Sequence, residues 1–89
     1  MENLMAEILG EERINRILKE VGLDEEEQEK ALGVIGKWEE TMKRGLGETE
    51  ERIKTAREIL KNDPSYIRIM RVLIRVNAEF ITQREEKGQ

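Results

Sequence analysis

The sequence predicts an all-α protein: one small domain (1–89) of four helices, the first of them broken near Gly10. Three observations support this prediction. The chain has one proline in 89 residues and is rich in Glu, Lys, Arg, Leu and Ile, which favour helix. Its apolar residues recur at spacings of three and four. Glycines and the segment Asn62-Asp63-Pro64 interrupt that pattern at intervals of about one helix length.

The first helical region has two apolar stripes that point in different directions. One lies within residues 4–9, and the other consists of Ile14, Ile17, Leu18 and Val21. At 100° per residue the two stripes do not align, so we expect a break or bend near Gly10. Gly22 is expected to end this region as the glycine that follows a helix.

The second helix is expected to begin after Asp24 and to run to about Arg44. Asp24 and Glu27 have the spacing of a capping box, and acids fill the first turn, where the helix dipole favours them. The apolar stripe of this helix comprises Ala31, Val34, Ile35, Trp38 and Met42. Gly33 and Gly36 lie off this stripe and would suit either a kink or the close approach of another helix.

A turn at residues 45–47 separates this helix from a third one, which begins near Glu48 or Thr49. We expect its buried face to consist of Ile53, Ala56, Ile59 and Leu60. Asp63 can cap the last helix, and Pro64 suits its first position. The last helix is therefore expected to run from Pro64 to about Glu86.

The last helix is the most apolar part of the chain. Between Tyr66 and Ile81 its apolar residues cover more than half of the helical circumference, which is wider than the stripe of a surface helix. We therefore expect this helix to be central and to form a homodimer interface. The residues at heptad spacing that predict the interface are Tyr66, Met70, Leu73, Asn77 and Phe80. Asn77 could fix the register there, or could bond to a backbone carbonyl at the edge of the core.

A row of three arginines, Arg68, Arg71 and Arg75, marks the polar side of the last helix. Guanidinium groups bind phosphates and carboxylates, so the row is a candidate contact for an anion or a nucleic acid. The alternative is a solvated face, or pairing with the acidic start of the second helix. The net charge of −4 disfavours nucleic acid, because phosphates repel an acidic chain.

The composition excludes several classes of function. The chain has no His and no Cys, so it has no Ser-His or Cys-His catalytic pair, no disulfide and no zinc site built from these residues. It has no apolar run near the roughly 20 residues of a membrane span. We predict no cofactor, metal or catalytic residue, and expect a cytoplasmic protein with a thermophile-like composition rich in Glu, Lys and Arg.

The segment from Asp63-Pro64-Ser65 through Leu73-Ile74 to Gln83 resembles the last helix of AroQ-type chorismate mutases. The resemblance implies a small all-helical dimer whose active site is built from arginines, a lysine and a late glutamine, here Gln83. The first helix lacks the long arginine-bearing pattern of that family, so Arg13 or Arg16 would have to take its place.

These observations favour a non-catalytic helical protein that acts in protein–protein interaction or regulation as a homo-oligomer. Two alternatives stay open: nucleic-acid binding through the row Arg68, Arg71 and Arg75, and a small enzyme similar to the chorismate mutases.

Overall fold

The computed structural model describes residues 4–44 and 48–87, and every regular element within these ranges is an α-helix. The helices are α1 (Leu4–Leu9), α2 (Glu11–Glu20), α3 (Glu25–Lys43), α4 (Thr49–Leu60) and α5 (Tyr66–Lys87). The predicted all-α fold is confirmed, including the broken first helix, which forms α1 and α2. The turn predicted at residues 45–47 lies outside the described residues.

Two glycines shape the first helical region, as the sequence predicts. Gly10 separates α1 from α2 with a φ of +89°, a backbone conformation that favours glycine. Gly22 follows α2 with a φ of +83°. Its N–H donates to the Lys19 carbonyl (2.9 Å), and the next N–H, of Leu23, donates to the Leu18 carbonyl (3.3 Å). This pair of bonds is a Schellman motif, which ends the helix and turns the chain toward α3.

The capping box predicted at the start of α3 is present. The Glu27 N–H donates to Asp24 Oδ1 (2.8 Å), and the Asp24 N–H donates to Glu27 Oε1 (3.0 Å). The helix then runs without interruption through Gly33 and Gly36 to Lys43. A Cβ added at either glycine would meet no atom within 4 Å. Neither glycine therefore marks the close approach of another helix within the described part of the chain.

The start of α5 differs by two residues from the predicted start at Pro64. The Ser65 N–H donates to Asp63 Oδ1 (2.8 Å), and the Tyr66 N–H donates to the Asp63 carbonyl (3.0 Å). Asp63 thus caps the helix, as predicted, but it does so by holding Pro64 and Ser65 in a turn. The helix begins at Tyr66.

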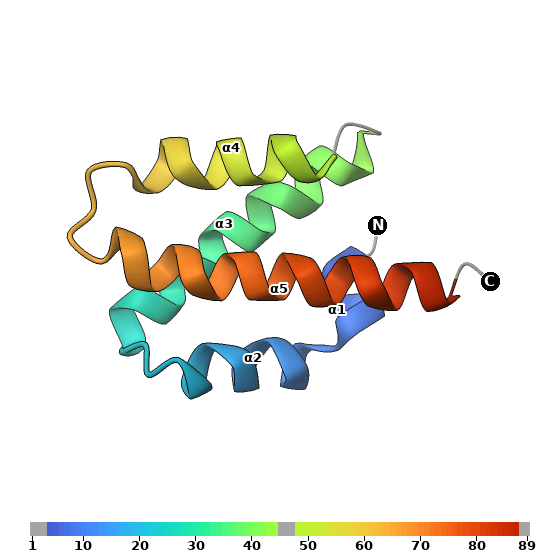
Figure 1. Ribbon diagram of the computed structural model, residues 1–89, viewed down its shortest axis with the longest axis horizontal. Coiled ribbons are helices and arrows are strands. Elements are labelled where there is room, and N and C mark those ends of the chain that lie inside the picture. Colours follow the sequence, from blue (N-terminus) through green and yellow to red (C-terminus); the bar gives the residue numbers. More distant parts are fainter. Residues whose placement is uncertain (1–3, 45–47, 88–89) are drawn as a thin grey trace.

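Helix α5 is the central element of the bundle, as predicted. It crosses the whole molecule, with α4 antiparallel to it on one side and α2 on the other, and α1 and α3 pass behind it (Figure 1). It contacts each of the other four described helices. One continuous core fills the space between them, and its largest apolar side chains are Trp38, Phe80, Met5, Ile17, Leu18, Ile69 and Leu73.

The buried face of α4 corrects one prediction. Ala56 and Leu60 are buried and Ile53 is partly buried, but Ile59 is 52% exposed. The third fully buried position on this helix belongs to Arg52 instead. Arg52, Ala56 and Leu60 are spaced four residues apart, so they share one side of the helix. Ile59 lies outside this buried side of α4.

Candidate functional site

Helix α5 has a buried side and an open side. Ile69, Val72, Leu73 and Val76 are fully buried, whereas Ile67 is 64% and Ile74 is 51% exposed. At 100° per residue, Ile67, Arg71, Ile74, Ala78 and Ile81 fall within about 80° of one another, on the opposite side from the fully buried residues. The first four are exposed, and Ile81 is partly buried against the edge of the core. We call these five residues the open flank. Its isoleucines at positions 67, 74 and 81 are seven residues apart.

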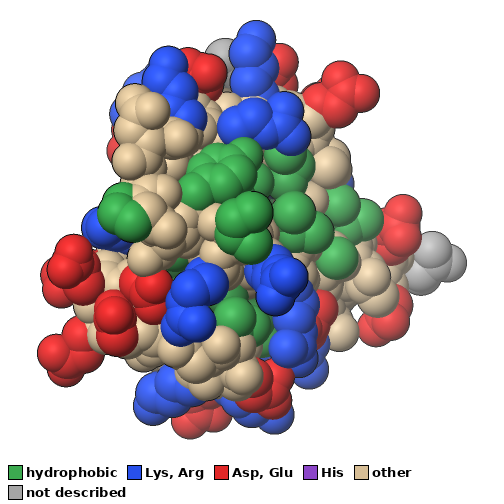
Figure 2. Space-filling view, turned by 60° about the vertical axis from the view of Figure 1, so that its left-hand side comes forward, with side chains coloured by type: hydrophobic (Ala, Val, Ile, Leu, Met, Phe, Trp, Pro, Cys, Tyr) green, Lys and Arg blue, Asp and Glu red, His purple; other side chains and the backbone are tan. Residues whose placement is uncertain are grey.

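Hydrophobic side chains gather on the surface where α5 begins. Figure 2 brings this end of the molecule forward and shows apolar side chains across the middle of the face, with Lys and Arg side chains above and below them. Ile67, in the first turn of α5, has the largest exposed fraction among the large apolar residues that the structure describes. The exposed apolar surface of α5 therefore lies beside positive charge.

The chain itself buries most of the residues that the sequence assigned to an interface. Leu73 has no exposed surface, and Phe80, Asn77 and Met70 are between 1% and 6% exposed. Tyr66 is partly buried against the same core. These side chains contact α5's neighbours within one chain and have almost no surface to offer a second one. The exposed apolar side chains of α5 are instead on the open flank, one residue further along the heptad at Ile67 and Ile74.

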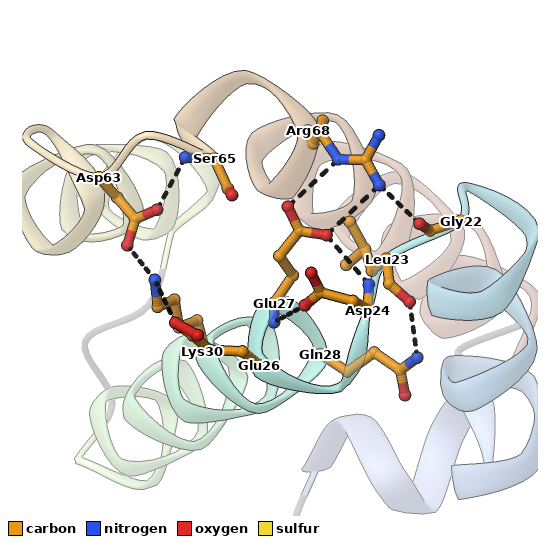
Figure 3. A network of polar contacts seen from close by, with 10 residues as sticks. All are labelled: Gly22, Leu23, Asp24, Glu26, Glu27, Gln28, Lys30, Asp63, Ser65 and Arg68. Atoms are coloured by element: carbon orange, nitrogen blue, oxygen red, sulfur yellow. Dashed lines mark hydrogen bonds and ion pairs between the residues drawn. The ribbon is translucent and has the colours of Figure 1, made fainter.

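The first arginine of the row, Arg68, is held by the corner between α2 and α3. Its Nε donates to Glu27 Oε2 (3.2 Å), and one of its terminal nitrogens donates to Glu27 Oε1 (3.3 Å) and to the Gly22 carbonyl (2.5 Å). Figure 3 shows this guanidinium between Glu27 and Gly22. Arg68 thus joins α5 to the start of α3, which is the internal pairing that the sequence left open.

Glu27 is the centre of this network. It is a buried carboxylate that accepts from the Asp24 N–H within the capping box and from Arg68. Hydrogen bonding from the Ser65 side chain and the Asp24 backbone, together with Arg68, lowers its pKa from about 4.5 to about 2. Nearby, the Lys30 ammonium binds Asp63 Oδ2 at 2.6 Å and holds the pKa of that carboxyl below its usual value. Both carboxylates tie α3 to the start of α5 (Figure 3).

A first testable prediction concerns Glu27→Gln. The folded carboxylate keeps its charge at a pH where the unfolded chain is already protonated, so it stabilises the fold above pH about 4.5, and this contribution disappears as the pH falls toward 2. The variant should therefore unfold at a lower temperature than the wild type at pH 7. The difference should shrink between pH 4.5 and 2.

Thermal unfolding followed by circular dichroism from pH 2 to 7 measures this difference. Glu29→Gln, an exposed change on the same helix, controls for the loss of one negative charge. A constant difference between the wild type and Glu27→Gln across the whole pH range would contradict the role of the ionised Glu27.

The other two arginines of the row have different surroundings. Arg75 is paired with Glu20 of α2 at 2.7 Å and with Glu79 of its own helix at 3.4 Å. Arg71 is exposed and makes no ion pair with any residue in ranges 4–44 and 48–87. The row is therefore not one continuous positive surface, because glutamates neutralise its two ends and leave Arg71 open between them.

Two further arginines, Arg13 and Arg16, lie close to the row. They are the residues that the chorismate mutase resemblance requires. An open polar pocket lies between α2 and α5, and its lining includes Arg13, Arg16, Arg75, Glu20 and Glu79. Arg13 approaches Glu79 at 3.8 Å. Glu20 and Glu79 thus pair with arginines of this pocket, and their negative charge opposes the binding of a dicarboxylate. Gln83 is partly buried and does not line this pocket.

A buried polar cluster around Arg52 is a feature that the sequence analysis missed. The Arg52 side chain is fully buried, and its Nε donates to Asn77 Oδ1 at 2.6 Å. Its terminal nitrogens also donate to Thr49 Oγ1 (3.2 Å) and to Met42 Sδ (3.6 Å), and Trp38 Nε1 donates to the Arg52 carbonyl (2.8 Å). Asn77 therefore bonds to a side chain of α4, which neither of its two predicted roles anticipated.

The aromatic ring of Phe80 extends this cluster. The guanidinium carbon of Arg52 lies 5.4 Å from the ring centroid, and that of Arg84 lies 5.0 Å from it. Both distances suit a cation–π contact. Burial lowers the pKa of Arg52, and the positive charge of Arg84 lowers it further. The cluster joins α3, α4 and α5 through their interior side chains, so its role is to fix how these helices pack.

Within ranges 4–44 and 48–87, no three His, Cys, Asp or Glu side chains are placed to hold a metal ion. In the part of the chain that the structure describes, no helix has the length and apolar character needed to cross a bilayer.

Comparison with known proteins adds no relative. No protein-family model, no curated protein and no solved structure matches this chain.

Proposed function

We propose that this chain is a non-catalytic interaction protein that acts as a homodimer, with the open flank of α5 as its contact surface. The observation that carries the proposal is the exposure of Ile67 and Ile74 on a helix whose other side forms the core. Burying apolar surface contributes roughly 25 cal/mol per Å², so covering two such side chains in each copy favours association.

The surroundings of the flank support a protein partner over a nucleic acid. A phosphate backbone would have to displace Glu27 from Arg68 and Glu20 from Arg75 before it could use the row. Within the row, Arg71, between the two isoleucines, is the arginine that no carboxylate of the described residues pairs with. The net charge of −4 further opposes the approach of a polyanion. Apolar side chains around one open arginine suit a protein surface instead.

A helix pair of this size gives a weak dimer. We expect a contact along one helix to bury less than the roughly 800 Å² per partner of a standard stable interface, and we therefore expect dissociation in the micromolar range. This expectation sets the concentrations at which the proposal is tested.

Sedimentation equilibrium from 1 to 200 µM tests the proposal. The wild type should move with concentration from the 10.4 kDa of one chain toward twice that mass. The double variant Ile67→Glu/Ile74→Glu should stay at the mass of one chain, because two carboxylates cannot be buried in an apolar contact. Circular dichroism shows whether the variant keeps its helices.

Leu32→Glu is the matched control. Leu32 is an exposed apolar residue (44%) on α3, in the groove between α2 and α3, and lies outside the flank. This variant should dimerise like the wild type. A wild type that has the mass of one chain at every concentration would overturn the proposal, and so would equal loss of association in both variants.

A further inference from the structure

The N-terminal and C-terminal halves of α5 differ in charge. From Tyr66 to Val76 the helix has Arg68, Arg71 and Arg75 and no acidic residue. From Asn77 to Lys87 it has Glu79, Glu85 and Glu86 beside two basic residues. A second copy of the same helix would therefore meet very different charges in its two directions.

We infer that two copies of α5 pack antiparallel along the open flank, with Ile74 at the two-fold axis. This inference rests on the proposed homodimer and specifies its geometry. Ile67 and Ile81 are each seven residues from Ile74. In the antiparallel pair Ile74 meets its own copy, and Ile67 of each chain meets Ile81 of the other, so every isoleucine of the seam has an isoleucine partner.

The side chains that meet along the seam favour this direction over the parallel one. A parallel pair would also match the isoleucines, but it would place Arg71 beside Arg71 of the second copy and Glu85 beside Glu85. Like charges in adjacent positions are destabilising. With Ile74 at the two-fold axis, the antiparallel pair places Glu79 of one copy across from the turn of the other that contains Arg68 and Arg71, and it places Glu85 beyond the start of the other copy's α5.

Side-chain size agrees with the same direction. Arg71 is three residues before Ile74, and Ala78 is four residues after it. In the antiparallel pair, Arg71 of one copy therefore lies across from Ala78 of the other. Ala78 is exposed and small, so the aliphatic stem of Arg71 can lie over it while the guanidinium stays in water. Arg71 is the arginine of the row that has no carboxylate partner among the described residues.

Disulfide cross-linking tests the direction, and the chain has no cysteine to interfere. A disulfide needs Cα atoms within about 7 Å. In the antiparallel pair Ile74→Cys reaches its own copy. Two copies of Ile67→Cys lie fourteen residues apart along the seam, or about 21 Å at 1.5 Å per residue. Ile67→Cys should cross-link only when it is mixed with Ile81→Cys.

The experiment oxidises each variant, and a mixture of Ile67→Cys and a size-tagged Ile81→Cys, at 200 µM. Non-reducing gels should show a covalent dimer for Ile74→Cys and a mixed dimer for the pair. Leu32→Cys controls for random collision. If Ile67→Cys forms a covalent dimer with itself in the same yield as Ile74→Cys, the pair is parallel and the inference is overturned.

Sedimentation of the wild type separates this failure from that of the proposed function. If the wild type dimerises but Ile74→Cys gives no more covalent dimer than Leu32→Cys, the antiparallel seam is wrong while the homodimer stands. If the wild type does not dimerise, both are wrong.

Discussion

Leu73→Ala is expected to lower the free energy of unfolding by about 2–5 kcal/mol, the cost of truncating a fully buried leucine. Leu73 has no exposed surface and lies in the core that α5 shares with the other helices. The loss should have the same size at low and high protein concentration, because the contacts that Leu73 makes lie within one chain. Urea unfolding at 2 and 200 µM measures it.

Ile74→Ala, at the next residue, is the matched control. Ile74 is 51% exposed, so its truncation should change the stability of the monomer by no more than about 0.5 kcal/mol. Its effect should appear instead as weaker association. If Leu73→Ala weakens association and leaves the fold of one chain intact, Leu73 faces a partner, and the side of α5 assigned to the core is wrong.

Replacing either member of the buried pair Arg52 and Asn77 should also destabilise the fold strongly. Asn77→Leu keeps the number of side-chain heavy atoms but leaves the buried Arg52 Nε–H without its acceptor, which should cost about 1–3 kcal/mol. Arg52→Met leaves the Asn77 carbonyl oxygen without its donor, at a cost of about 1–3 kcal/mol. The double variant Arg52→Met/Asn77→Leu leaves neither polar group unpaired.

The double variant should therefore be more stable than the sum of the two single losses predicts, by at least about 1 kcal/mol. Lys54→Met, an exposed change on the same helix, should change stability by less than about 0.5 kcal/mol. Chemical denaturation of the four variants and the wild type gives the coupling. Additive losses would show that Arg52 and Asn77 do not depend on each other.

The sequence predicts the helices well because their boundaries rest on local chemistry. The capping box of Asp24 and Glu27 and the left-handed glycines Gly10 and Gly22 act within a few residues of the boundary that they set. The start of α5 is two residues late for a reason of the same kind, since Asp63 makes a turn with Ser65 before the helix begins. Local patterns therefore carry most of the fold.

The packing of α4 was harder to predict because hydrophobicity alone misassigns Arg52 and Ile59. A lone arginine among glutamates and lysines has the pattern of a solvated residue, and an isoleucine has the pattern of a core residue. The spacing of Arg52, Ala56 and Leu60 is a usable signal for the buried side. It is weak, however, without knowledge that Asn77 and Phe80 of α5 lie opposite.

The sequence assigns the interface to a line of α5 residues that the chain itself buries, so the surface proposed here lies one residue further along the helix. The width of the apolar arc indicates correctly that α5 is central, yet several heptad lines fit within so wide an arc. Which heptad line is buried depends on where α2, α3 and α4 pack against α5. That packing is set by tertiary contacts, which the local sequence pattern does not contain. The pairing of Arg68 with Glu27, across 41 residues of sequence, has the same origin.

Thiol labelling at two concentrations most directly tests whether the chain covers one side of α5 and a second copy covers the other. Single cysteines at positions 73, 74 and 32 are labelled with a maleimide under reducing conditions at 1 and 200 µM. We expect Leu73→Cys to react slowly at both concentrations and Leu32→Cys to react fast at both. Ile74→Cys should react fast at 1 µM and several-fold more slowly at 200 µM. An Ile74→Cys rate that does not fall with concentration would contradict the proposed dimer surface.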